Sequence, residues 1–451
     1  MHDGTHEGGG RVPALVVAVF ILWAVLWNIV GVYGASTFGH GPSTFTCLAG
    51  IGLLCALATP LSRRLAALPG RAPETLVVTV LTIAVYASLV VHTLVLADAV
   101  RSDIMVDIGR NTLEAARHFF DRRENPYATN CQMDRLAGLP HVTLAQGRWL
   151  IFGVPYDRGY PYFPVMFLAY QPFRLLDPGL EAIRYGNVVF MAAALVGTYW
   201  LAARLAAARR LAAWLAVAST VAIWALGYMV FRAGVTDLMI ADFALFGFIA
   251  LTYERGATAG VLFGLAMAAK LTPGALLVPI LVAWQAKASA GPARWRLWLA
   301  AGAVLAGTLV PFIAWNPRAF LSATVLYTSV RHALGDDSSL WYFLPAALKT
   351  PFLVAGAAMV VAILVVGLRR RPLGIVDLVA VYFLAQLALV GFYKMIHTNY
   401  LWAVLPLGAV AFSVRLTSSL AGPQRQSGGS QRDASVAVGA RPMEASATPA
   451  R

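Results

Sequence analysis

Residues 98–124 read DAVRSDIMVDIGRNTLEAARHFFDRRE and open a long polar loop, Asp98 to Tyr160, that lies between apolar segments. The ionisable side chains of this stretch include Asp103, Asp107, Arg110, Glu114, Arg117, His118, Asp121 and Glu124. A membrane protein that concentrates charge in one loop beside a span usually holds a functional site there. The loop therefore predicts both the class of protein and the place of its site.

The composition of the 451-residue chain excludes a soluble domain. Hydrophobic residues make up 59% and charged residues 12%, a balance that polar surface could not cover in water. Apolar runs near the roughly 20 residues that cross a bilayer recur along the chain. We expect an all-α polytopic membrane protein of about twelve spans. These cover residues 12–34, 44–61, 76–97, 161–176, 185–203, 211–228, 235–252, 258–284, 297–315, 352–368, 375–394 and 399–416.

Short basic loops predict the orientation. By the positive-inside rule these loops are cytoplasmic, as are both termini, and the loops at 98–160 and 316–350 and His397 are then external. The basic residues concerned are Arg63, Arg64, Arg71, Lys287, Arg294, Arg296, Arg369, Arg370, Arg371 and Arg415. We expect a multi-pass protein of the plasma membrane.

Twelve spans leave one exception to this rule, because Arg204, Arg209 and Arg210 fall outside. A rival topology makes 161–176 a re-entrant helix and breaks 258–284 into two passes at Lys270-Leu271-Thr272-Pro273. That topology moves the three arginines inside. It leaves the two long loops and His397 outside.

The sequence divides into a membrane domain, residues 1–420, and a tail, residues 421–451. The tail is rich in Ser, Gly, Ala, Pro and Gln without apolar periodicity, which predicts a disordered cytoplasmic segment. The net charge of +14 is scattered over short loops rather than along one face, which favours anionic lipid headgroups over nucleic acid as the counterpart.

Within the first long loop, polar residues recur at helical spacing, with Ile108, Leu113 and Phe120 between them. The pattern predicts a helix along the membrane surface whose polar face carries Asp107, Asn111, Glu114, Arg117 and Asp121. Asp103 and Asp107 are four positions apart, so on one helix their charges would raise the pKa of one carboxyl. Such a carboxylate suits a general base. The alternative is that these charges are only the solvated face of the helix.

Two turn signals follow this helix. Asn125-Pro126-Tyr127 predicts a turn, and Tyr160-Pro161-Tyr162-Phe163-Pro164 enters the next apolar segment. Prolines there leave backbone carbonyls free, which a membrane tolerates only where the backbone meets protein or lines a cavity.

The order of these pieces resembles the membrane glycosyltransferases of the GT-C fold. An Asp follows an outward span, then come a helix containing Ala115-Ala116, the Asn125-Pro126-Tyr127 turn and Tyr160-Pro161 at the next span. The segment 259–266 (AGVLFGLA), followed by Lys270-Leu271-Thr272-Pro273, is similar to that of glycosyltransferase family 87, which includes polyprenol-phosphate-mannose-dependent mannosyltransferases. The resemblance covers about residues 76–406.

The resemblance implies an inverting transfer of a sugar from a polyprenyl-phosphate donor to a lipid or glycan acceptor outside the membrane. Mannose is the sugar that it favours. Arabinofuranose is the alternative sugar. A polyprenyl phosphate is a good leaving group, so the reaction needs a carboxylate to deprotonate the acceptor hydroxyl and cations to hold the phosphate. The resemblance assigns the base to Asp107, with Asp103 as the competing choice.

The remaining candidate site residues fall into two sets. Phosphate partners are Arg110, Arg117, Lys270, Arg331, His332 and His397, and substrate-pocket side chains are Tyr127, Tyr160, Asn399 and Tyr400. Lys270 interrupts an apolar run, and the alternative to a functional role is snorkelling of its ammonium to the interface. For Arg232, Asp237 and Asp242 we expect ion pairing between helices. Asp336-Asp337 lacks an evident third ligand, so no metal and no cofactor is expected.

Two other functions fit a polytopic chain. A secondary transporter would use the intramembrane charges as a relay, but transporters usually show two comparable halves, and the long loop occurs once. A flippase or a scaffold for envelope assembly is the third possibility. We therefore expect a glycosyltransferase and not a transporter, a flippase or a scaffold.

Overall fold

The computed structural model describes residues 72–99, 107–131, 141–223, 236–287, 293–330, 344–369, 373–392 and 404–420. The predicted spans 12–34 and 44–61 and the tail from residue 421 lie outside these ranges.

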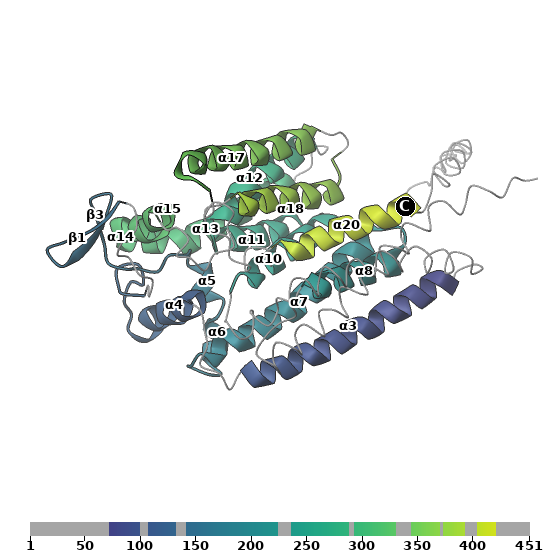
Figure 1. The fold of residues 1–451 in the computed structure, drawn as a ribbon, viewed down its shortest axis with the longest axis horizontal. Coiled ribbons are helices and arrows are strands. Elements are labelled where there is room, and N and C mark those ends of the chain that lie inside the picture. The colour runs from purple at the N-terminus through teal and green to yellow at the C-terminus, as the bar shows by residue number, and fades with distance from the viewer. Residues whose placement is uncertain are drawn as a thin grey trace, which may run out of the picture.

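Within the described residues, the fold is a bundle of apolar helices with a small polar region at one end (Figure 1). The helices of the bundle are α3 (Ala72–Ala99), α7 (Glu181–Leu205), α8 (Arg209–Ile223), α10 (Leu238–Thr252), α11 (Gly256–Met267), α12 (Leu271–Lys287), α13 (Ala293–Trp315), α17 (Ala346–Arg369), α18 (Ile375–Gly391) and α20 (Leu405–Leu420). They confirm helices over the described parts of eight predicted spans, namely 76–97, 185–203, 211–228, 235–252, 297–315, 352–368, 375–394 and 399–416.

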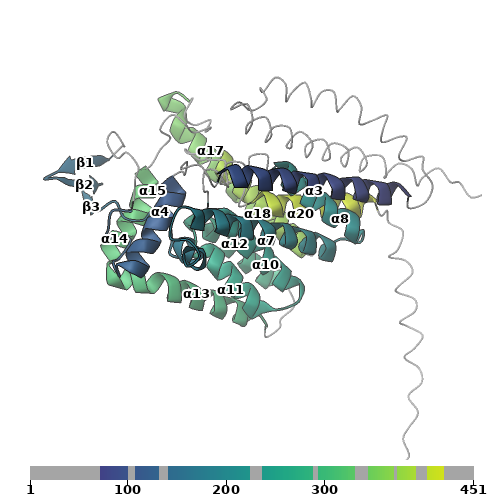
Figure 2. The ribbon, with the colours of Figure 1, turned by 90° about the horizontal axis from the view of Figure 1, so that it is seen from below.

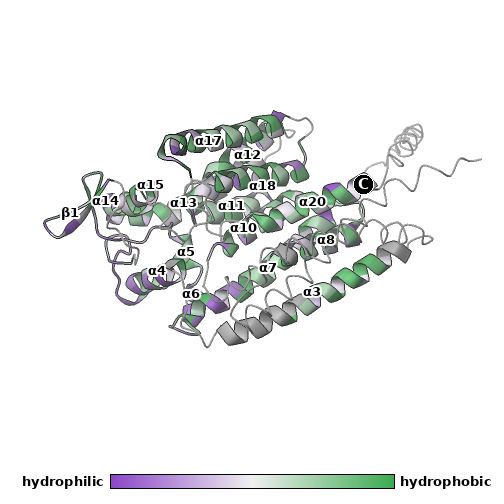
Figure 3. Ribbon diagram, viewed as in Figure 1, coloured by the Kyte–Doolittle hydropathy of each residue, from purple (hydrophilic) through white to green (hydrophobic). Residues whose placement is uncertain are grey.

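Length and composition make some of these helices able to cross a bilayer. Of the described residues, Glu181–Leu205, Trp295–Trp315 and Ala346–Arg369 meet both conditions, and shorter apolar helices accompany them. Apolar residues dominate the long helices, whereas hydrophilic residues gather on α4 and around the strands (Figure 3). The predicted class, an all-α polytopic membrane protein, is confirmed.

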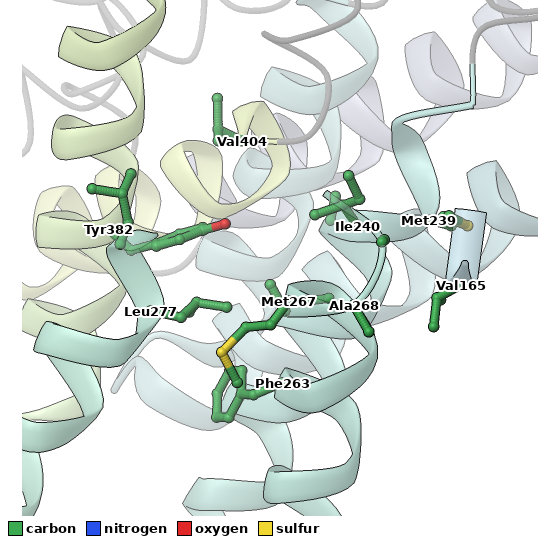
Figure 4. Packing of buried hydrophobic residues seen from close by; sticks show 14 of the residues in the cluster. Val165, Met239, Ile240, Phe263, Met267, Ala268, Leu277, Tyr382 and Val404 are labelled. Atoms are coloured by element: carbon green, nitrogen blue, oxygen red, sulfur yellow. The ribbon is translucent and has the colours of Figure 1, made fainter. Parts of the chain in front are cut away.

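The core lies where α10, α11, α12, α18 and α20 converge. Phe263 and Met267 of α11 pack there with Leu277 of α12 and the ring of Tyr382 of α18, all buried (Figure 4). Small residues let α11 approach α13 closely, because a Cβ atom at Gly260 would lie 2.1 Å from the carbonyl oxygen of Leu297.

The polar end of the molecule is built from short elements. They are α4 (Asp107–Ala116), the π-helix η1 (Arg117–Asp121), α5 (Val165–Leu168), α6 (Gln171–Arg174), α14 (Pro317–Leu321), the π-helix η3 (Ser322–Leu326) and α15 (Tyr327–Val330). Figure 2 shows α4, α14 and α15 together at this end, beyond the long helices.

The prediction of one membrane-crossing helix over residues 161–176 is wrong. This stretch contains α5 and α6, of four residues each, with Ala169 and Tyr170 between them. Pro164 precedes α5 and Pro172 lies in the first turn of α6, the positions where proline is tolerated. The stretch therefore forms two short helices and not one long one.

The prediction of one span over residues 258–284 is also wrong, and the alternative break is confirmed. Helix α11 ends at Met267 and α12 begins at Leu271, so Lys270 lies between two helices. Helix α11 packs on α10 and α13, whereas α12 packs on α17 and α18.

This break changes the position of Arg204, Arg209 and Arg210. They lie where α7 ends and α8 begins, and the Arg204 guanidinium is 4.9 Å from the ring centroid of Tyr253, between α10 and α11. The C-terminal end of α20, which carries Arg415, is likewise at the end of the bundle away from α4 and the strands (Figure 1). The three arginines thus lie at the same end of the bundle as Arg415, as the rival topology predicts, and the orientation of that end stays a prediction.

A three-stranded antiparallel sheet in the first long loop was not predicted. It consists of β1 (Val142–Ala145), β2 (Arg148–Ile151) and β3 (Val154–Tyr156). Both turns, Gln146-Gly147 and Phe152-Gly153, have positive φ at both residues, as a two-residue hairpin of type I′ requires. The sheet projects from the polar end and is anchored there by Tyr156, whose ring stacks on Tyr327 at 5.3 Å.

Candidate functional site

Helix α4 is amphipathic, as the sequence predicts. Ile108 and Leu113 are buried, whereas Arg110 is exposed and Glu114 is half-buried. Asn111 is the correction to the predicted polar face, because it is fully buried. The helix continues as η1, and π-helical turns are frequent at functional sites.

One ion pair joins η1 to α6, and one hydrogen bond joins η1 to the segment that follows α6. Arg174 is buried, and its Nη2 lies 2.5 Å from Oδ2 of Asp121. Nη1 of Arg117 lies 2.5 Å from Oε1 of Glu114, and Nη2 of Arg117 donates to the carbonyl of Pro178 over 3.0 Å. Arg117, a predicted phosphate partner, is thus also one of the contacts that fix the helix.

The predicted turn at Asn125-Pro126-Tyr127 is confirmed. The side-chain oxygen of Asn125 accepts from the backbone N–H of Tyr127 over 3.0 Å, which is an Asx turn. The Tyr127 hydroxyl donates to the carbonyl of Tyr162 over 2.9 Å, and the backbone N–H of Tyr160 donates to the carbonyl of Pro126 over 2.9 Å. The turn is thereby joined to the segment before α5.

Tyr127 and Tyr160, predicted for the substrate pocket, are both buried. The Tyr160 hydroxyl lies 3.0 Å from Oγ1 of Thr112 on α4. Burial raises the pKa of both phenols well above its ordinary value, so they remain neutral hydrogen-bonding groups. In this structure they connect α4 to residues 160–164.

The two interrupted segments, 161–165 and 268–270, meet through their backbones. The N–H of Phe163 donates to the carbonyl of Ala269 over 3.2 Å, and the N–H of Val165 donates to the carbonyl of Ala268 over 3.1 Å. Each break would otherwise leave polar backbone groups without partners in an apolar setting. The prediction that the backbone after Tyr160 meets protein is confirmed.

This contact brings Lys270 beside Asp237. The Nζ atom of Lys270 donates to Oδ1 of Asp237 over 2.7 Å, with side-chain exposures of 11% and 1%. The same Nζ lies 5.3 Å from the ring centroid of Tyr162, within the range of a cation–π contact. Ion pairing of Asp237 is confirmed, but its partner here is Lys270. Arg232 lies outside the described residues.

A second carboxyl group, that of Asp242, lies on α10, the helix that begins directly after Asp237. Asp242 of α10 is 4% exposed, and within the described structure neither carboxyl oxygen has a hydrogen-bond partner. Close by in the bundle, the Tyr170 hydroxyl donates to Oδ1 of Asn187 over 2.6 Å. Sequence reasoning missed Tyr170 and Asn187, since neither is charged and both sit in apolar runs.

The contacts form one continuous path from α4 to Asp237. It runs from Thr112 to Tyr160, whose ring meets that of Tyr162 at 5.5 Å, and from Tyr162 to Lys270 and Asp237. Asp107 is the first residue of α4 and lies one helical turn before the buried Asn111. Arg110, also on α4, is exposed.

The other predicted site residues lie outside the described ranges. They are Asp103, Arg331, His332, His397, Asn399 and Tyr400. Among the described residues, no group of three His, Cys, Asp or Glu side chains is placed to hold a metal ion.

Comparison with known proteins gives two similar solved structures, both of ArnT from Cupriavidus metallidurans. The one bound to undecaprenyl phosphate has a TM-score of 0.47 and 16% sequence identity, covering 73% of this chain and 59% of that one. The one in the apo state has a TM-score of 0.42 and 18% identity, covering 74% and 59%. The chain thus matches 59% of the length of each ArnT chain. No protein-family model and no curated protein matches it.

Proposed function

We propose that this chain is an inverting membrane glycosyltransferase of the GT-C type. It moves a sugar from a polyprenyl-phosphate donor to a lipid or glycan acceptor at the end of the bundle that carries α4. The sugar that we propose is mannose, because the sequence resembles family 87. The observation that carries this proposal is the path from α4 through Tyr160 and Tyr162 to the pair of Lys270 and Asp237.

A donor phosphate at the membrane rim needs a cation that is fixed before the donor arrives. Lys270 meets this need, because Asp237 and the Tyr162 ring hold its ammonium at the break between α11 and α12. A preorganised cation in a site of low dielectric stabilises the charge that develops on the departing phosphate. Exposed Arg110 is a further cation on α4.

The acceptor hydroxyl needs a base on the other side of the reacting carbon. Asp107 has this role in the proposal, since it begins the amphipathic helix that faces the same path, and Asp103 is the competing candidate. An inverting displacement needs only this one carboxylate, because polyprenyl phosphate leaves without a strong general acid.

The second candidate function is a secondary transporter, and buried Asp242 favours it. An ionisable group inside a membrane bundle is expensive and commonly marks an ion or proton path. Asp242 is 4% exposed, and neither of its carboxyl oxygens has a hydrogen-bond partner in the described bundle. A transporter would move a solute without forming a glycosidic bond.

The test is transfer by the purified full chain in proteoliposomes that contain a lipid extract as acceptor. Polyprenyl-phosphate mannose, polyprenyl-phosphate arabinofuranose and GDP-mannose, each labelled in the sugar, are compared. We expect a new labelled product from the first donor and none from the nucleotide sugar. Product from GDP-mannose, or uptake of solute without any product, would overturn the proposal.

A further inference from the structure

A groove lies between α17 and α18 at the basic end of the bundle, away from α4. It encloses about 320 Å³, within the range of ligand pockets. Helices α17 and α18 approach each other closely at Gly367, since a Cβ atom there would lie 2.3 Å from Cγ2 of Val381. The two helices are therefore in close contact at Gly367, and the groove lies beside this contact.

The walls of the groove are largely apolar, and some of their side chains are exposed. Val366 of α17 is 61% exposed and Leu384 of α18 is 44% exposed, and both line it. From Asp377 to Leu384 the groove follows α18 for about 10 Å, at 1.5 Å per residue. This shape suits a hydrocarbon chain that runs parallel to the helices.

The mouth of the groove is polar. Arg415 Nη2 donates to Oδ1 of Asp377 over 2.9 Å, and Oδ2 of Asp377 accepts from the backbone N–H of Gly374 over 3.2 Å. Both oxygens of Asp377 are thus engaged, whereas the remaining N–H donors of Arg415, which is 47% exposed, have no partner within the described part of the chain. They are available to an acceptor from outside the protein.

The charge at the mouth is positive. Arg369 is the exposed last residue of α17. It is not one of the lining residues, but it follows the lining residue Val366 by three positions and so lies one turn further along the same face of the helix. Arg369 and Arg415 together outweigh the single carboxylate of Asp377. An anionic headgroup would gain more from this excess than a zwitterionic one, whose own cation offsets its phosphate. Basic pockets between membrane helices on the cytoplasmic side are typical sites for anionic headgroups.

We propose that this groove binds an anionic phospholipid, with the phosphodiester of its headgroup on Arg415 and one acyl chain between α17 and α18. The site is separate from the path of Tyr162 and Lys270, which lies at the other end of the bundle. It does not depend on the proposed transfer reaction.

The experiment is native mass spectrometry of the full-length protein with equal amounts of phosphatidylglycerol and phosphatidylcholine that carry the same acyl chains. We expect the parent protein to prefer phosphatidylglycerol. R415Q should reduce this preference about fivefold, the equivalent of ~1 kcal/mol for one arginine at a membrane surface. R415K keeps the charge and should retain the preference.

Two further variants separate the groove from general lipid contact. R210Q removes an exposed arginine from the same end of the bundle and should leave the preference unchanged. A362W fills the groove from an exposed position of α17, leaves the pair of Asp377 and Arg415 intact, and should abolish the selective adduct. Equal effects of R415Q and R210Q, a selective adduct that survives A362W, or no preference in the parent protein would overturn the proposal.

Discussion

Lys270 and Asp237 form a buried ion pair although they are 33 positions apart: Nζ donates to Oδ1 over 2.7 Å. Asp237 is the residue directly before α10, and Lys270 is the residue directly before α12. The pair thus links the starts of two helices at the end of the bundle that holds α4.

Breaking this pair should cost stability whichever partner is removed. D237N removes the charge that faces the ammonium and K270M removes the charge that faces the carboxylate, and loss of one partner of a buried ion pair typically costs about 3–5 kcal/mol. The double variant D237N/K270M should unfold at a temperature nearer to that of the parent protein. Thermal unfolding in detergent measures this.

The same variants separate stability from activity. If Lys270 holds the donor phosphate, transfer should remain absent in D237N/K270M even where its stability recovers. Recovery of transfer together with stability would mean that the pair is only structural.

Asp107→Asn keeps the size of the side chain and removes the proton acceptor. Transfer should fall by a factor of roughly 100 to 10,000, the usual contribution of a general base, while donor binding is retained. Asp103→Asn should cost less, because the role proposed for Asp103 is only to raise the pKa of the Asp107 carboxyl. Single-turnover rates with a labelled donor measure both.

Asp157→Asn is the matched control, since Asp157 is an exposed carboxylate of the same loop. It should not alter the rate. A loss of transfer only in Asp103→Asn would show that Asp103, one helical turn earlier, is the base. Small and equal losses of transfer in both variants would mean that the two carboxylates only form the solvated face of the helix.

Cys131 should be unreactive in the folded protein. Its thiol is buried and donates to the carbonyl of Pro126 over 3.3 Å, and burial raises the pKa of the thiol from 9.0 to about 12. At pH 8 the thiolate population is then roughly a thousandth of that of an ordinary cysteine. In a C47S/C55S background, maleimide should label the chain only after denaturation. Rapid labelling at pH 8 without denaturant would show that this turn opens.

The orientation can be tested with cysteines at two exposed arginines in that background. Arg148→Cys lies in β2, and Arg210→Cys lies near the start of α8 at the basic end. An impermeant maleimide should label Arg148→Cys in intact cells and Arg210→Cys only after permeabilisation, because basic ends of spans stay in the cytoplasm. The reverse pattern would place α4 inside, where a lipid-linked donor would not be expected.

Hydropathy was sufficient to locate most helices, because a segment such as Ala346–Arg369 has no other stable state in a bilayer. It failed at residues 161–176, where the apolar content outweighed the prolines in the prediction. The break after Met267 was available as an alternative because Lys270 and Pro273 interrupt the run.

The candidate site was only partly predictable. The turn at Asn125-Pro126-Tyr127 depends on neighbouring residues and could be read locally. The partner of Asp237 and the burial of Asn111 depend on how helices pack, which one sequence does not display. The sheet had a local signal, since Gln146-Gly147 and Phe152-Gly153 are two-residue turns between β-prone runs, and it was overlooked.

The two backbone hydrogen bonds between residues 163–165 and 268–269 also set an order of events in biogenesis. The first segment leaves the ribosome roughly a hundred residues before the second, which at ordinary elongation rates is about 5–20 seconds. During that interval, the amides of Phe163 and Val165 lack their final acceptors and stay hydrated or borrow other partners. The early segment therefore waits at the membrane boundary until α11 has been inserted, and a stall or truncation before Ala268 would leave the site unassembled.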